Sequence, residues 1–201
     1  DTWWWCPSEM VPFEGSNQPA YPSMFKALVD RRVGQGYTVA QMAFLAGGGS
    51  VPGPEAWMRD AEAGAPDMAF WQAADRCIAY ANEAGLLPAI GMGFGPALDR
   101  YSLEAWQRLW DYVVARYGAW AVTWLVCGEY NSADGDLAGR LPKVMALGQF
   151  IKDRDPWERA MTVHPWWHGG DKHQAWTEPW CDFIMVQGAH DANTPVNVYL
   201  D

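Results

Sequence analysis

The chain has 201 residues, with 14 basic and 24 acidic side chains and a net charge of −10, a length that suits one domain with a sizeable core. Because this acidic balance would repel phosphate backbones and anionic lipid surfaces, we expect neither nucleic acid nor a membrane as a partner. No run of about 18 apolar residues is present, so no membrane span is predicted.

Helical and strand-like segments alternate along the chain. Residues 22–34 carry apolar side chains at three- and four-residue spacings and end at glycines, which predicts a helix, and the apolar run 37–45 predicts a buried strand. The pattern repeats with helices at 67–83, 103–116 and 137–154, and with strands at 86–94, 121–127, 160–164 and 180–187. This alternation predicts a parallel sheet with right-handed crossovers. A barrel is favoured over a doubly wound fold because no glycine-rich phosphate turn follows the first strand.

Tryptophan is unusually frequent, with 14 copies, and its flat ring suits both a core and a sugar-binding surface. We expect the tryptophans inside periodic segments to be core residues: Trp106, Trp110 and Trp124. We expect those in the loop segment between 164 and 176 to contact sugar: Trp166, Trp167 and Trp176.

Polar residues follow three of the predicted strands in succession. They are Glu129 and Asn131, then His164 and Trp166, then Gln187 and His190. Because the active site of a barrel lies at the carboxyl ends of its strands, we expect these side chains to share one rim.

Glu129 is the candidate catalytic group at this rim. Glycoside hydrolysis uses two carboxyl groups, one protonated and one ionised. Glu129 leaves an apolar strand, an environment that favours the protonated acid, and Asn131 is near enough in sequence to bond it or a substrate. Spacing alone also allows a loop glutamate held in a salt bridge. A serine hydrolase is not indicated, since no G-x-S-x-G motif occurs.

Metal and thiol chemistry are not predicted. The four cysteines form no CxxC pair, and Cys77, Cys127 and Cys181 lie in apolar runs, so we expect unpaired core thiols. His164 and His190 with Glu129 would make a three-ligand site, but no HxH or HExxH spacing supports it. We therefore expect no metal and no cofactor, with that site kept as an alternative.

The motifs resemble those of the apiosidase-like glycoside hydrolases, a family of (β/α)8 barrels. Asp1-Thr2-Trp3-Trp4 is similar to the family's Gly-Asp-Thr-x-Trp at the end of the first strand. Residues 122–129 are similar to the strand ending in Trp-x-x-Gly-Gly-Asp, and residues 182–190 to Asp-Phe-x-Met-x-Gln-Ser-Gly-His. His164-Pro165 falls where the family has His-Pro.

The resemblance implies an α/β fold, a (β/α)8 TIM barrel truncated at both ends, with residues 1–201 forming a single partial catalytic domain from the end of strand 1 through strand 6. Glu129 would be the acid/base. Other residues of the sugar site would be Asp1, Trp4, His164, Gln187 and His190. The family's usual residue at position 129 is aspartate, so the acid of this chain would sit one methylene further out.

The implied activity is cleavage of glycosidic bonds in plant or microbial polysaccharides or oligosaccharides. The family's second carboxylate is expected after a seventh strand, beyond Asp201, so we expect this chain alone to be inactive. The family implies a secreted or periplasmic location, although no signal peptide is visible. A non-catalytic carbohydrate-binding barrel and the metal-dependent hydrolase remain alternatives, and the sugar, the linkage and the stereochemistry stay open.

Overall fold

The computed structural model describes residues 2–5, 24–43, 58–60, 65–132, 135–166 and 174–185. Its main sheet is parallel, with the order β1 (Thr2–Trp5), β2 (Val39–Ala43), β5 (Leu87–Gly91), β6 (Thr123–Gly128) and β7 (Met161–His164). The strand order equals the chain order, so this sheet lacks the reversal of a doubly wound fold.

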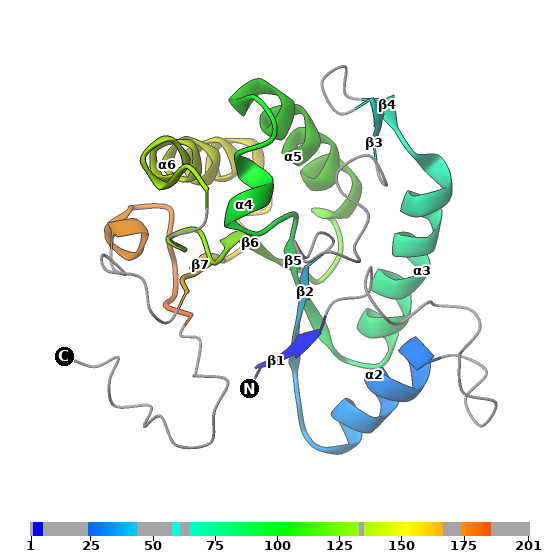
Figure 1. Cartoon of the computed structure of the whole chain (residues 1–201). Coiled ribbons are helices and arrows are strands. Elements are labelled where there is room, and N and C mark those ends of the chain that lie inside the picture. The colour runs from blue at the N-terminus through cyan, green and yellow to red at the C-terminus, as the bar shows by residue number, and fades with distance from the viewer. Residues whose placement is uncertain are drawn as a thin grey trace.

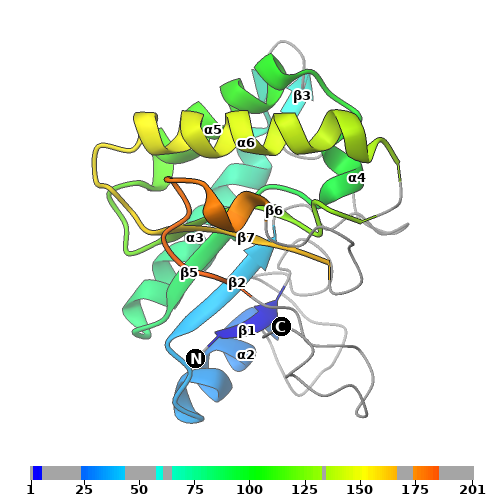
Figure 2. The ribbon, with the colours of Figure 1, turned by 90° about the vertical axis from the view of Figure 1, so that its left-hand side faces the viewer.

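Four long helices lie in an arc along one side of this sheet (Figure 1; Figure 2). They are α2 (Met24–Gly34), α3 (Met68–Glu83), α5 (Leu103–Tyr117) and α6 (Leu137–Arg154). Each lies in the chain between two neighbouring strands of the sheet. The predicted α/β alternation is confirmed, and no described helix is long and apolar enough to cross a membrane.

Local capping sets the ends of these helices. The side chains of Asp67, Ser102 and Asp136 accept hydrogen bonds from the first turns of α3, α5 and α6, which satisfies N–H groups that a helix leaves open. Gly36 and Gly85 turn the chain from α2 and α3 toward the next strand with φ of +88° and +85°, a conformation that glycine adopts without strain.

The predicted strand 86–94 is shorter in the structure. β5 ends at Gly91, and after Phe94 a short helix follows, α4 (Gly95–Leu98). The antiparallel hairpin of β3 (Met58–Asp60) and β4 (Ala65–Pro66) and the 3-10 helix η2 (Gln174–Thr177) were not predicted.

The predicted strand 180–187 is wrong in its described part, because residues 180–185 contain no strand. The segment is tied to β7 largely through side chains: the Met161 N–H donates to Asp182 Oδ2 at 2.9 Å, and Thr162 Oγ1 donates to the Phe183 carbonyl at 2.6 Å. These bonds replace the regular backbone ladder of a strand. The family motif Asp1-Thr2-Trp3-Trp4 was expected at the end of the first strand, but in the structure β1 runs from Thr2 to Trp5.

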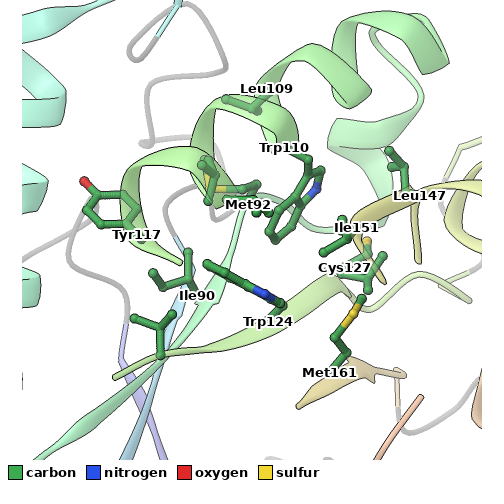
Figure 3. Packing of buried hydrophobic residues seen from close by; sticks show 14 of the residues in the cluster. Ile90, Met92, Leu109, Trp110, Tyr117, Trp124, Cys127, Leu147, Ile151 and Met161 are labelled. Atoms are coloured by element: carbon green, nitrogen blue, oxygen red, sulfur yellow. The ribbon is translucent and has the colours of Figure 1, made fainter. Parts of the chain in front are cut away.

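The hydrophobic core lies between the sheet and the helices (Figure 3). Trp106, Trp110 and Trp124 are core residues as predicted, with 2%, 0% and 0% of their surface exposed. Cys77 and Cys127 are free buried thiols, as expected, and Cys181 is free and half-buried. Cys6 lies outside the described residues.

Candidate active site

The backbone joins the ends of β5, β6 and β7. Glu129 follows directly after β6, and its N–H donates to the carbonyl of His164, the last residue of β7, at 2.5 Å. The N–H of Gly128 donates to the carbonyl of Gly93, just after β5, at 2.9 Å. Three strand ends therefore meet at the candidate acid, at the end of a parallel sheet where active sites of barrel enzymes lie.

Asn131 connects the segment after β6 to the segment after β7. Its side chain is 5% exposed, and its Oδ1 accepts a hydrogen bond from the Trp166 N–H at 2.6 Å. Within the described part of the chain, its Nδ2 is buried and has no hydrogen-bond partner. This amide is therefore a donor that a substrate hydroxyl could satisfy.

Four of the predicted site residues thus lie together: Glu129, Asn131, His164 and Trp166. Glu129 itself is partly exposed, so a ligand can reach it. The residue has a φ of +47°, a left-handed conformation that costs a residue with a Cβ about 1–2 kcal/mol. The Ser132 N–H donates to the Glu129 carbonyl at 3.0 Å, so residues 129–132 form a compact turn, here called the Glu129 turn.

The rings of His164 and Phe94 pack against each other beside Glu129. The His164 ring is 3% exposed and meets the Phe94 ring edge-on, with centroids 6.4 Å apart and planes at 61°. A Cβ added at Gly128 would lie 2.8 Å from the Phe94 ring, so only glycine fits at this strand end. Sequence reasoning missed Phe94, and no local signal marks it.

An ion pair between the buried Arg140 and the partly exposed Asp99 lies next to the Glu129 turn. Arg140 of α6 is fully buried, and its Nε and Nη2 donate to the carboxylate of Asp99 at 3.0 and 2.6 Å. Burial alone would raise the pKa of Asp99, but hydrogen bonds from Arg140 and from the Asp136 N–H, with the nearby charge of Lys143, hold it below its ordinary value. Sequence reasoning missed this pair, although the spacing of α6 shows a signal: Arg140 lies on its apolar stripe with Val144, Leu147 and Ile151.

The structure does not describe the side chains of several other predicted site residues. Asp1, Gln187 and His190 lie outside the described residues, and of Trp4 only the backbone is described, in β1 at the sheet edge opposite β7. Trp176 is half-buried and packs against the core, while Trp167 lies outside the described residues. Among the described residues no group of three metal-binding side chains occurs. Since His190 is not among them, the three-ligand alternative stays untested.

The fold is shared with solved glycoside hydrolases. One matches with a TM-score of 0.65 and 20% identity over 83% of this chain and 38% of its own. A family 5 glycoside hydrolase from Bacteroides vulgatus matches at 0.65 and 18% over 84% and 37%, and a family 5 enzyme from Prevotella bryantii at 0.56 and 16% over 80% and 53%. The chain thus spans well under two thirds of the length of these structures.

The family is identified by sequence. Residues 1–200 match the apiosidase-like catalytic domain, and the chain belongs to this family of glycoside hydrolases. A search of curated proteins gave no match. The predicted family resemblance is confirmed.

Proposed function

We propose that the whole protein cleaves glycosidic bonds in plant or microbial polysaccharides or oligosaccharides, and that Glu129 is its proton donor. Family membership supports a carbohydrate substrate. The observation that carries the assignment of the acid is the position of Glu129: partly exposed at the end of β6, and bonded through its backbone to His164.

Neighbouring side chains supply the remaining contacts in this proposal. Glu129 protonates the leaving oxygen of the glycosidic bond. The buried Nδ2 of Asn131, which has no partner among the described residues, donates to a sugar hydroxyl, Trp166 offers its ring to a sugar face, and His164 lines the site. From the family we add Asp1, Trp4, Gln187 and His190 as further sugar contacts.

The second carboxyl group comes, in this proposal, from a later strand of the whole protein. Residues 1–201 would form one partial (β/α)8 barrel domain, supported by five parallel strands in chain order with helices along one side. A separation of about 5 Å between the two carboxyl groups would give retention of configuration, and about 6.5–9.5 Å would give inversion.

The test compares hydrolysis of aryl glycosides and plant cell-wall oligosaccharides by the whole protein and its Glu129→Gln variant. The matched control is Glu158→Gln, because Glu158 also has a positive φ, +50°, but is exposed and precedes β7 rather than following a strand. We expect kcat to fall by about 10²–10⁴-fold in Glu129→Gln and to stay unchanged in the control.

Other outcomes select the alternatives. Sugar binding without turnover would make the protein a carbohydrate-binding barrel, with Glu129 as a ligand contact. Turnover that is lost on chelation would favour the metal-dependent hydrolase. Equal turnover in the Glu129→Gln variant and the wild type would remove Glu129 from the mechanism.

A further inference from the structure

Arg140 is an unusual residue for the face of α6 on which it lies. The guanidinium is fully buried beside the apolar residues Val144 and Leu147. Its charge cannot be removed by deprotonation in a protein, so burial requires compensating bonds. Apolar side chains of similar volume often stabilise a protein equally well, which leaves the charge at this position to be explained.

The guanidinium of Arg140 donates hydrogen bonds to two separate parts of the chain. Nε and Nη2 bind the carboxylate of Asp99, at the end of α4. Nη1 lies 3.1 Å from both the carbonyl oxygen and Oγ of Ser132, and 3.3 Å from the carbonyl of Tyr130. Tyr130 and Ser132 flank Asn131, and Tyr130 directly follows Glu129, so Arg140 binds the backbone of the Glu129 turn on both sides of Asn131.

The short helix α4 completes this arrangement. A Cβ added at Gly95 would lie 2.6 Å from both Arg140 Nη1 and the Glu129 carbonyl oxygen, so the start of α4 packs directly on the guanidinium and the turn. Lys143 Nζ donates to the carbonyls of Leu98 and Tyr101 at 2.6 and 2.8 Å. The chain on either side of Asp99 is thereby attached to α6, the helix that carries Arg140.

We infer that the Asp99–Arg140 pair is a positioning device that holds Glu129 and Asn131 in the geometry for catalysis. This inference rests on the proposed function of Glu129. The pair supports the left-handed backbone of Glu129, which an unsupported glutamate rarely adopts. The planar guanidinium of arginine can donate to the Asp99 carboxylate and to the turn at the same time, whereas the single ammonium of a lysine cannot.

The test is steady-state kinetics of the whole protein with Arg140→Lys, using Arg116→Lys as the matched control. Arg116 of α5 makes a two-bond pair of the same geometry with Asp75 of α3, at 2.7 and 2.5 Å. This pair is more exposed than Asp99–Arg140, and its printed bonds join two helices and involve no residue of the Glu129 turn. We expect kcat of Arg140→Lys to fall about 10- to 100-fold, with KM close to wild type. The kcat of Arg116→Lys should stay at the wild-type value.

The outcomes separate this inference from the proposed function. A kcat for Arg140→Lys equal to that of the control, with both proteins folded by circular dichroism, would overturn the positioning role. If Arg140→Lys does not fold, Asp99→Asn replaces it, with a smaller fall in kcat expected because the bonds from Arg140 to the turn remain.

If the wild-type protein hydrolyses no glycoside, the proposed function fails and a crystal structure of the folded variant decides the inference. A Glu129 φ outside the left-handed region would support the positioning role. An unchanged Glu129 turn would refute it.

Discussion

The hydrogen bond between Trp124 and Asp155 offers a direct test of what holds β6 in place. Trp124 is fully buried, and its Nε1 donates to Asp155 Oδ2 at 2.8 Å. Asp155 caps α6 and also accepts from the backbone N–H groups of Trp157 and Arg159 at 3.0 and 2.8 Å. One indole therefore links the sheet to the turn between α6 and β7, and Trp124→Phe removes that link.

The expected cost has two parts. A buried hydrogen bond to a charged group contributes about 1.5–3 kcal/mol to the free energy of unfolding. Asp155 keeps two backbone donors, which places this part near the low end of that range. Loss of the pyrrole part of the indole adds about 1–3 kcal/mol for transfer and cavity formation. The total destabilisation is about 2.5–5 kcal/mol.

The control is Trp110→Phe, which removes the same atoms from the same aromatic pair. The Trp110 ring meets the Trp124 ring edge-on with centroids 6.1 Å apart, and it is equally buried (Figure 3). Within the described chain its Nε1 has no hydrogen-bond partner. Removing a buried unpaired N–H recovers about 1–3 kcal/mol, which offsets the similar cost of transfer and cavity formation, so the stability of this variant should stay within about 2 kcal/mol of the wild type in either direction.

The measurement is urea unfolding of the whole protein followed by far-UV circular dichroism, with stability taken from the linear extrapolation. Trp124→Phe should be the less stable variant by at least about 1.5 kcal/mol. Equal values for the two variants, within about 0.5 kcal/mol, would show that the Trp124–Asp155 bond adds nothing beyond packing.

Three further predictions concern the end of β6, the carboxyl group of Asp99 and the buried thiols. Gly128→Ala should reduce kcat, because its Cβ would lie 2.8 Å from the Phe94 ring, and Phe94→Leu in the same chain should restore part of the activity; no loss in the single variant would contradict this contact. The pKa of Asp99 is lower in the folded state than its ordinary value, so its stabilising effect is present above about pH 4 and is lost as the pH falls further. The Asp99→Asn variant should therefore lose less stability than the wild type between pH 7 and pH 3 in urea titrations, and parallel curves would refute the assignment. Burial raises the pKa of the Cys77 thiol to about 12 and also raises that of Cys127, so a thiol reagent at pH 8 should label both only after unfolding, as mass spectrometry of digested peptides would show.

Local sequence determined the helices. The predicted helix 137–154 has the bounds of α6, because Asp136 caps its first turn and apolar residues recur at helical spacing. The strand prediction 160–164 was also close to β7. These signals depend on residues a few positions apart, so the sequence alone carries them.

Tertiary structure decided where strands end. The predicted strand 86–94 continues past two glycines, but β5 ends at the first of them, Gly91, and Phe94 then packs its ring beside Gly128 and His164. The apolar run 180–187 was predicted as a strand, but its described part is tied to β7 by the Asp182 side chain instead. Burial of an apolar run does not specify its backbone conformation, because several conformations bury it.

The candidate site was only partly accessible from sequence. Position after a strand predicted that Glu129 and His164 share an edge, since parallel strands end together. Only the folded chain shows the contact between Asn131 and Trp166, which are 35 residues apart, and the burial of Arg140 against the Glu129 turn. A hydrogen bond between distant segments depends on how two elements pack. That packing depends on many residues of the core, so neither of the two bonded residues predicts it alone.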